Sequence, residues 1–448
     1  MRPTEYHAEF AAALGESGEF RLIPQVDSRR LGDGQTVEYR IDSAKFYLPP
    51  VLGPDRLLDT WDLLHAVYMV DCLSPRELQA DPRLVGDRWP RRLLLQLPLR
   101  DPSFWLNGDA SRILNSLLEY LTGNEWVVEP TSHPRSGSGS ARRLVLLEDI
   151  KPQSVNVVLH SGGLDALLGL ALTGVENLRG VTVAASTSTH SHMGALQRRV
   201  VRELQRTVPG LRLTTATIQY KLRHGLEAKE PTQRTRILKC IATGAVTSIA
   251  LGGRRLIVAE NGPGAINLPS NPLDAAPHLS RGVHPFSLQL LADLISLALG
   301  ETFTIENPLL TLTKGEVVAS LSDLGLSPLI ELTNSCDRFP YTSARHHCGV
   351  CSSCVLRSIA LWHHPSTRRL ASMSSLRQPS SALAHYQMSA WRLDQALRGA
   401  DPIQSLLRYD QRFDRVLPVI GEGSCLAMLG RHRDEIMEFI DASLPEAA

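Results

Sequence analysis

The chain has 448 residues, enough for two or three domains, and 43% of them are apolar, which is enough to fill hydrophobic cores. Lys and Arg total 47 against 46 Asp and Glu, so the formal net charge of +1 argues against nonspecific binding of nucleic acid. The first ten residues contain no apolar signal core and no stretch has the length needed to span a bilayer, so we expect a cytoplasmic protein without a membrane partner.

Residues 1–150 are predicted to form a separate α+β unit. Hydrophobic periodicity predicts helices at 57–73 and 113–121 and strands at 91–99, 125–129 and 144–147. The last two strands would pair across 132–140, whose Ser and Gly content indicates a flexible loop. Asp71 and Asp101 flank apolar runs, where solvated or helix-capping carboxylates are expected. We expect this unit to recognise a substrate or a partner.

From residue 155 the sequence predicts a strand, a tight loop and a helix. The run VNVVL predicts a buried parallel strand, and the leucine-rich segment after Asp165 predicts a helix. The loop between them reads Ser161-Gly162-Gly163-Leu164-Asp165. Its glycines let the backbone approach a ligand, and the N–H groups of the helix N-terminus suit an anion such as phosphate. The spacing matches neither the Walker nor the dinucleotide-binding pattern, and an ordinary strand-to-helix turn is the alternative.

Strand and helix patterns then alternate. The predicted strands are 155–159, 180–185, 211–218 and 255–259, and the predicted helices are 164–173, 193–208 and 232–250. This alternation predicts an α/β fold with a doubly wound parallel sheet that binds ligands at the carboxyl ends of its strands. The polar loop 186–192 could hold an adenine or a ribose, although its histidines, His190 and His192, also fit plain surface positions.

Two arginines fall in the first turns of the helix predicted at 232–250, for which Thr232 or Thr235 would be the cap. The helix dipole disfavours cations at this end, so Arg234 and Arg236 favour a phosphate or carboxylate partner, with a solvent-facing position as the alternative.

Two more polar groups follow. Glu260 and Asn261 come after the strand at 255–259, on the same edge as Ser161, and offer an acceptor and an amide suited to the edge of a purine-like base. Lys314 can bind a phosphate as a point charge, and Glu316 falls in the first turn of the helix that follows it.

Four of the seven cysteines lie close together in the sequence, with the spacing C-x11-C-x2-C-x2-C: Cys336, Cys348, Cys351 and Cys354. Four thiolates at these intervals can close a tetrahedral Zn²⁺ site, with Gly349 permitting a tight turn. An iron–sulfur cluster is the alternative. Complete thiolate coordination leaves no open position, so the metal would be structural. The other thiols, Cys72, Cys240 and Cys425, are predicted to pack in apolar surroundings.

Four segments together resemble the QueC family, the 7-cyano-7-deazaguanine synthases of the ATP pyrophosphatase superfamily. They are SGGLDA at 161–166, Pro-x-x-Arg-Thr at 231–235, Lys-x-Glu at 314–316, and the cysteine segment at 335–361. The resemblance implies an adenine nucleotide alpha hydrolase-like PP-loop fold that uses ATP, Mg²⁺ and a structural Zn²⁺. It also implies that the carboxylate of 7-carboxy-7-deazaguanine is adenylated and that ammonia then displaces AMP.

Carried over by position, the resemblance assigns roles to the candidate residues. ATP would be bound by Ser161, Gly162, Gly163, Leu164, Asp165 and Ala166, and zinc by Cys336, Cys348, Cys351 and Cys354. The catalytic residues would be Asp165, Arg234 and Lys314. Arg234, Lys314 and Glu316 would also line the substrate site, together with Glu260 and Asn261. The family usually has Ser at the position of Ala166, so one hydroxyl contact to phosphate is lost.

The chain is longer than ordinary QueC enzymes on both sides of the PP-loop domain expected at 151–364. The unit at 1–150 precedes it, and a helical extension at 365–448 follows, with helical periodicity at 380–397 and 402–420. We expect the extension to pack on the PP-loop domain or to form a partner surface.

With Glu260-Asn261-Gly262, the chain resembles QueC-like proteins of antiphage operons, those of type IV CBASS and QatC of Qat systems. That family implies an amide between the activated deazaguanine and the N-terminal amine of a partner, here a CD-NTase or a Qat-system protein. Residues 1–150 could form a channel for that terminus. The alternatives are nitrile synthesis with ammonia, a tRNA-modifying pyrophosphatase, and an inactive nucleotide-binding subunit.

Overall fold

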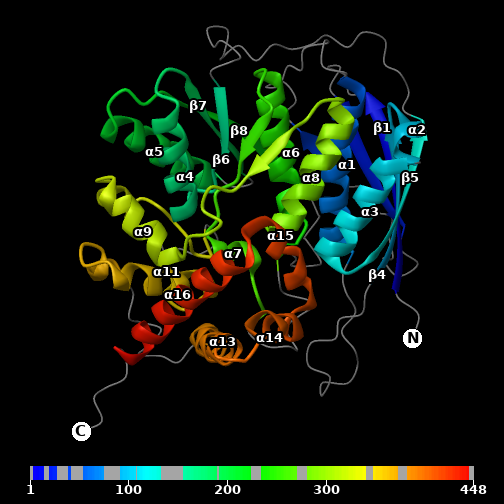
Figure 1. The fold of residues 1–448 in the computed structure, drawn as a ribbon. Coiled ribbons are helices and arrows are strands. Elements are labelled where there is room, and N and C mark those ends of the chain that lie inside the picture. Colours follow the sequence, from blue (N-terminus) through cyan, green and yellow to red (C-terminus); the bar gives the residue numbers. More distant parts are fainter. Residues whose placement is uncertain are drawn as a thin grey trace.

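The computed structural model describes residues 4–14, 20–27, 39–41, 54–74, 91–106, 108–132, 155–188, 191–222, 234–269, 280–339, 347–371 and 381–442. Within these residues, ten strands form one sheet in the order β10-β9-β6-β7-β8-β3-β2-β1-β4-β5 (Figure 1). The strands are β1 (Thr4–Leu14), β2 (Phe20–Asp27), β3 (Tyr39–Ile41), β4 (Arg91–Leu99), β5 (Glu125–Ser132), β6 (Val155–Leu159), β7 (Val181–Ser188), β8 (Leu213–Leu222), β9 (Arg255–Ile257) and β10 (Thr304–Glu306).

Helices connect these strands and continue beyond the last one. The first group is α1 (Pro54–Leu73), α2 (Pro102–Leu106), α3 (Gly108–Thr122), α4 (Leu164–Glu176), α5 (Ser191–Thr207), α6 (Arg236–Ala250), α7 (Gly262–Ile266) and α8 (Pro285–Leu299). The second group is α9 (Lys314–Asp323), α10 (Ser327–Ile330), α11 (Ser352–His363), η5 (Arg368–Leu370), α13 (Ser381–Leu397), α14 (Pro402–Tyr409), η6 (Gln411–Arg415), α15 (Leu417–Ile420) and α16 (Glu422–Asp441).

The five strands from β10 to β8 are parallel to one another, which confirms the predicted parallel sheet of an α/β fold. Both faces of this part are buried. Val157 packs into the core that contains α6 and α8, whereas its neighbour Val158 packs into the core that contains α4, α5 and α9. Successive side chains of a strand point to opposite faces, so the apolar run at 155–159 fills two cores at once.

The N-terminal strands continue the same sheet. β1, β4 and β5 are parallel, β1, β2 and β3 are antiparallel neighbours, and β3 joins the other half by pairing antiparallel with β8. Helices α1 and α3 pack against α6 and α8, and their apolar residues share one core. The strand predicted at 125–129 is β5, which pairs with β4; the segment 144–147 lies outside the described residues.

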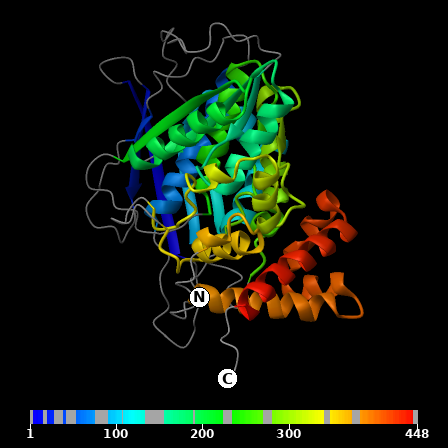
Figure 2. The same cartoon turned by 90° about the vertical axis from the view of Figure 1, so that its left-hand side faces the viewer.

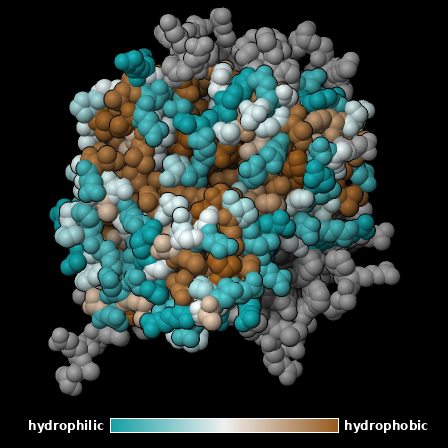
Figure 3. All heavy atoms as spheres, in the orientation of Figure 1, coloured by the Kyte–Doolittle hydropathy of each residue, from teal (hydrophilic) through white to brown (hydrophobic). Residues whose placement is uncertain are grey.

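The C-terminal helices stand out from one corner of the molecule, where α16 packs on α13 and α11 (Figure 2). The helix predicted at 402–420 is instead divided into α14, η6 and α15. Asp410 has an extended backbone, and its side chain accepts a hydrogen bond from the Arg412 N–H, which starts a new turn. Figure 3 shows apolar side chains gathered across the middle of the face above these helices, between hydrophilic rims.

The remaining predicted elements agree in place with observed ones, except that the helix predicted from 232 begins at Arg236. The observed strands and α-helices that the sequence did not predict are β1, β2, β3, β10, α2, α7, α8, α10, α11 and α16. In the described part of the chain, no helix is both long and apolar enough to cross a bilayer.

Candidate nucleotide site and four-cysteine centre

The loop between β6 and α4 contains a glycine in the left-handed region and an exposed serine. Gly162 has a φ of +91°, which glycine adopts without strain, and a Cβ there would lie 2.9 Å from Leu196 Cδ2. Gly163 is the N-cap of α4 and provides no side-chain cap, so the first N–H groups of the helix face the loop. Ser161 is exposed, and its Oγ accepts a hydrogen bond of 3.3 Å from the Gly163 N–H. Leu164 and Ala166 are buried under the loop in the core.

A buried histidine, which the sequence did not single out, anchors this loop to α5. The His160 Nε2 donates to the Gln197 carbonyl at 3.2 Å, and the Gln197 Nε2 donates back to the His160 carbonyl at 2.9 Å. Burial lowers the pKa of His160 to about 4, so the ring is neutral at physiological pH. The loop is therefore fixed by an uncharged clamp.

Three segments that are distant in sequence meet beside the loop. Asp165 lies in the first turn of α4, Lys314 is the first residue of α9, and Glu260 follows β9. The Lys314 Nζ and the Asp165 carboxylate form a buried ion pair. The structure thus brings together Asp165, Lys314 and Glu260 from the predicted set.

Glu260 holds its proton more strongly than an ordinary glutamate. Its pKa is raised to about 8, mainly by burial and then by the negative charge of Asp165, while Lys314 opposes the rise. The cluster therefore contains an ammonium, a carboxylate and a carboxylic acid that ionises slightly above neutral pH. Such shifts are typical of groups that transfer protons.

The backbone and side chain of Glu260 are held in place by two asparagines. Asn307 accepts a hydrogen bond from the Glu260 N–H at 3.1 Å and donates one to its carbonyl at 2.8 Å. Asn261 donates to the Glu260 Oε1 at 2.8 Å and caps α7 by accepting from the Gly264 N–H at 3.0 Å. Asn261 is buried, so its amide orients Glu260 and α7 in the structure.

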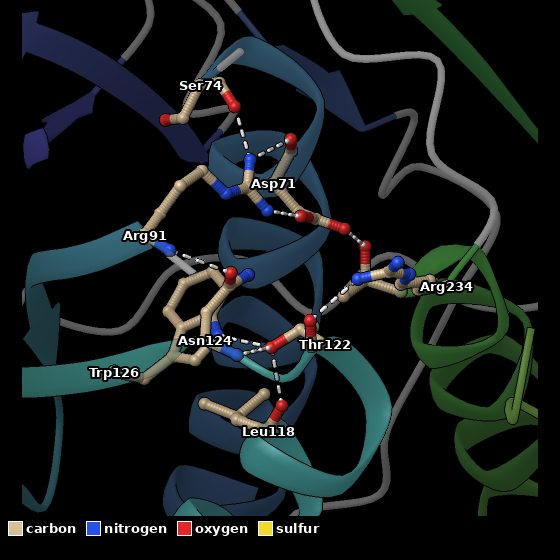
Figure 4. A network of polar contacts seen from close by, with 9 residues as sticks. Asp71, Ser74, Arg91, Leu118, Thr122, Asn124, Trp126 and Arg234 are labelled. Atoms are coloured by element: carbon tan, nitrogen blue, oxygen red, sulfur yellow. Dashed lines mark hydrogen bonds and ion pairs between the residues drawn. The ribbon is translucent and has the colours of Figure 1, made fainter. Parts of the chain in front are cut away.

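Arg234 lies where the start of α6 meets α1 and α3 (Figure 4). It precedes α6, is buried, and donates from Nη1 to the Thr122 carbonyl at 2.7 Å. The adjacent Thr235 is the N-cap of α6, but its hydroxyl donates to Asp71 at 2.7 Å instead of capping the helix. Asp71 is fully buried in an ion pair with Arg91, so the prediction of a solvated or capping carboxylate is wrong there.

Other predicted residues have simpler roles. Asp101 caps α2 through its bond to the Phe104 N–H, as predicted. Glu316 completes a capping box with Thr313 at the start of α9 and pairs with Arg431 at 2.7 Å. His192 is exposed, and His190 lies outside the described residues.

The four predicted metal ligands form a compact cluster. Their Sγ atoms all lie within 4.8 Å of one another, and Cys348 and Cys354 are 3.9 Å apart. Four sulfurs bound tetrahedrally to zinc at 2.3 Å are separated by about 3.8 Å, so the cluster can bind zinc. Gly349 has the positive φ expected for the tight turn.

The cysteine cluster is joined directly to the loop by Asn334. Its N–H donates to the Gly162 carbonyl at 3.0 Å, and its side-chain oxygen accepts from the Cys336 N–H at 2.8 Å. Arg357 in α11 supports the same strip by donating to the Ile330 carbonyl and the Thr333 hydroxyl. A metal bound by the cysteines would therefore stabilise one wall of the loop.

Comparison with known proteins finds similarity in the part of the chain that contains Lys314 and the four cysteines. Residues 285–364 match the family model of queuosine biosynthesis protein QueC. A 78-residue segment is 37% identical to a 7-cyano-7-deazaguanine synthase from Leptothrix cholodnii and covers 16% of this chain and 33% of that protein. The chain thus spans about a third of that curated relative. The QueC-matched range includes Lys314, Glu316 and all four cysteines, whereas the loop at 161–166 and Glu260 lie before it.

Proposed function

We propose that the protein is an ATP-dependent ligase that adenylates 7-carboxy-7-deazaguanine and joins it by an amide bond to an amine. The acceptor would be the N-terminal amine of a partner protein in antiphage defence. The observation that carries this proposal is the meeting of Asp165, from the glycine loop, with Lys314, from the QueC-matched segment.

The loop and Lys314 suit the first half of this reaction. An oxygen of the substrate carboxylate attacks the α-phosphorus of ATP, and pyrophosphate leaves with the electrons of the broken P–O bond. Negative charge grows on the phosphate oxygens during this step, and the α4 N-terminus and Lys314 would stabilise it. Lys314 would exchange its contact with Asp165 for a phosphate contact when ATP binds.

Glu260 suits the second half. The amine nitrogen attacks the acyl carbon, the bond to AMP breaks, and the nitrogen loses a proton. Glu260 in its carboxylate form would accept that proton, because its pKa of about 8 is close to that of an α-amino group. Its contact with Asn261 supports a fixed direction for this transfer.

Two metals fit the donor atoms. The Asp165 Oδ1 is buried and is not the oxygen that pairs with Lys314, so it could serve as one oxygen ligand for Mg²⁺. Mg²⁺ would neutralise phosphate charge. The thiolates of Cys336, Cys348, Cys351 and Cys354 would hold Zn²⁺ as a structural ion, because four ligands leave no position for substrate.

The elements outside the proposed nucleotide domain at 151–364 support a large acceptor. The proposed division into 1–150, 151–364 and 365–448 leaves β1 to β5 and α13 to α16 as additions to a nucleotide domain. An acyl adenylate reacts with any amine that is positioned beside it, so access decides the acceptor. We assign the added elements to partner recognition.

The test mixes the protein with ATP, the deazaguanine acid and proteins encoded by neighbouring genes. AMP, pyrophosphate and an N-terminal mass increase on one of them are expected, and Asp165→Asn should strongly reduce all three. Pyrophosphate release without any adduct would contradict the ligase assignment. Absence of pyrophosphate release under every condition would contradict adenylation itself.

The second candidate is nitrile synthesis with ammonia, which the similarity to a 7-cyano-7-deazaguanine synthase favours. Chromatography of the small-molecule products in ammonium buffer distinguishes the two. Release of 7-cyano-7-deazaguanine, with no protein adduct, would favour this alternative.

A further inference from the structure

The C-terminal helix α16 reaches the start of α9 and holds it on both sides of Lys314. The Glu435 carboxylate accepts a hydrogen bond from the Thr313 hydroxyl and another, 3.3 Å long, from the Gly315 N–H. Thr313 and Gly315 are the residues immediately before and after Lys314. A Cβ on Gly315 would overlap the Glu435 carboxylate, so the contact requires glycine there.

Further contacts along the same face of α16 strengthen this attachment. Arg431, one turn before Glu435, pairs with Glu316 at 2.7 Å and donates to the Thr311 carbonyl at 3.0 Å. A Cβ on Gly262, the first residue of α7 and two residues after Glu260, would lie 2.9 Å from the Met428 Cε. The helix therefore touches both segments that carry the charged groups beside Asp165.

Burying the Glu435 carboxylate costs free energy, because burial disfavours its charged form. Burial raises its pKa to about 7, and the charge of Glu316 adds to the rise, while Thr313, Gly315 and Arg431 oppose it. His363 in α11 donates from Nε2 to the Glu435 carbonyl at 2.7 Å, which fixes the backbone at this point. A carboxylate at a helix N-terminus is favoured by the dipole, which offsets part of the burial cost.

We propose that Glu435 is a positioning residue, which holds the start of α9 so that the Lys314 ammonium stays beside Asp165. The C-terminal extension is then part of the nucleotide site, and the reaction requires it to be docked. This inference rests on the proposed function for its catalytic consequence, but the effect on ATP binding can be measured without turnover.

The experiment compares Glu435→Gln with Asp434→Asn in the full chain. Asp434 is the adjacent residue, is exposed, and pairs with Arg433, so its variant makes the same chemical change away from the site. Displacement of a binding group by a fraction of an ångström is expected to reduce kcat/KM for ATP by about tenfold or more in Glu435→Gln, with Asp434→Asn within about twofold of wild type. The Kd for ATP, measured by calorimetry without the acid, should rise in Glu435→Gln only.

A second comparison tests the geometry. Gly315→Ala should displace the carboxylate and weaken ATP binding, but it should add little in a chain that already carries Glu435→Ala. Such non-additivity is expected only if both changes act through one contact.

If Glu435→Gln lowered Tm but left kcat/KM and the ATP Kd at wild-type values, Glu435 would be a helix cap and the inference would be overturned. Independent effects of Gly315→Ala and Glu435→Ala would also overturn it. If the wild type bound ATP but released no pyrophosphate, the proposed function would fail, whereas the Kd ratio would still decide this inference. If the wild type bound no ATP, both would fail.

Discussion

Two buried cations lie at helix starts, and their surroundings differ. Arg234 precedes α6 and binds the Thr122 carbonyl, next to the buried Asp71–Arg91 pair between α1 and β4, which Thr235 connects to α6. Lys314 begins α9 and binds Asp165 beside the open loop, where Glu260 retains a proton to about pH 8. The group around Arg234 has protein partners in α1, β4 and α3. The group around Lys314 lies beside the start of α4, whose first N–H groups have no side-chain cap.

A cation at a helix N-terminus therefore indicates an anionic partner but not whether that partner is a protein carboxylate or a ligand. The carboxylate near the start of α6 is Asp71, a residue of the protein itself. It forms an ion pair with Arg91 and accepts a hydrogen bond from the Thr235 hydroxyl. The carboxylate near the start of α9 is Asp165, and beside it lies the glycine loop, whose helix N-terminus suits a further anion. We therefore expect substitutions in the first group to change stability and substitutions in the second to change chemistry.

The largest expected effect is the loss of the buried ion pair. Asp71→Asn leaves the Arg91 guanidinium buried without its counter-charge, so the free energy of unfolding should fall by about 3–5 kcal/mol. Denaturant unfolding measures it. The control is Asp109→Asn, which removes an exposed pair with Arg112 and should change stability by less than about 1 kcal/mol. An unfolding free energy equal to wild type would contradict the structural role.

The second effect concerns catalysis. Asp165→Asn should reduce pyrophosphate release by about 10²–10³-fold, because it removes the carboxylate that holds Lys314 and could bind Mg²⁺. Circular dichroism should show a folded chain. Lys314→Met should have an effect of similar size, and the double variant should be little worse than either single one. Wild-type turnover by Asp165→Asn would remove the distinction between the two groups.

The sequence predicted the parts of the molecule that depend on neighbouring residues. The loop at 161–165 follows an apolar run and precedes a helical one, and the four cysteines lie within one short segment, so both were predicted from local spacing. The first shows the expected strand, positive-φ glycine and helix, and the second shows sulfur atoms close enough to bind one ion.

The partners of Arg234 and Lys314 depend on contacts between distant segments. Thr122 is 112 residues from Arg234, and Glu435 is 122 residues from Thr313. No periodicity in the chain connects such pairs, because tertiary packing decides which helix ends meet. The charge pattern before α6 was therefore interpreted as an anion site, although the structure gives it protein partners. The catalytic role of Arg234 stays a prediction, and its contact with the Thr122 carbonyl leads us to expect a structural role instead.

Arg234→Met tests that role directly. The substitution removes a hydrogen bond between a charged donor and the buried Thr122 carbonyl, which should lower the free energy of unfolding by about 1–3 kcal/mol. The kcat of the folded protein should stay near wild type. Arg236→Met, two residues later at an exposed position, is the matched control. If Arg234→Met kept its stability but lost its turnover, Arg234 would belong with Lys314 in the chemistry.

The smallest expected effect is a pH dependence that distinguishes Glu260 from the fixed network. Burial raises its pKa from 4.5 to about 8, so the folded protein binds a proton that the unfolded chain releases. This stabilisation is fully present below pH 4.5 and is lost as the pH rises through about 8. Glu260→Gln keeps the shape and cannot titrate. The unfolding free energy of the wild type should therefore fall relative to this variant between pH 5 and pH 8.5, on the order of 1 kcal/mol or more. Glu435, whose pKa is raised to about 7, titrates in both proteins and cancels in the difference. Parallel pH curves would show that Glu260 is ionised throughout, and the assignment of Glu260 as the base that ionises near the pKa of an amine would then be wrong.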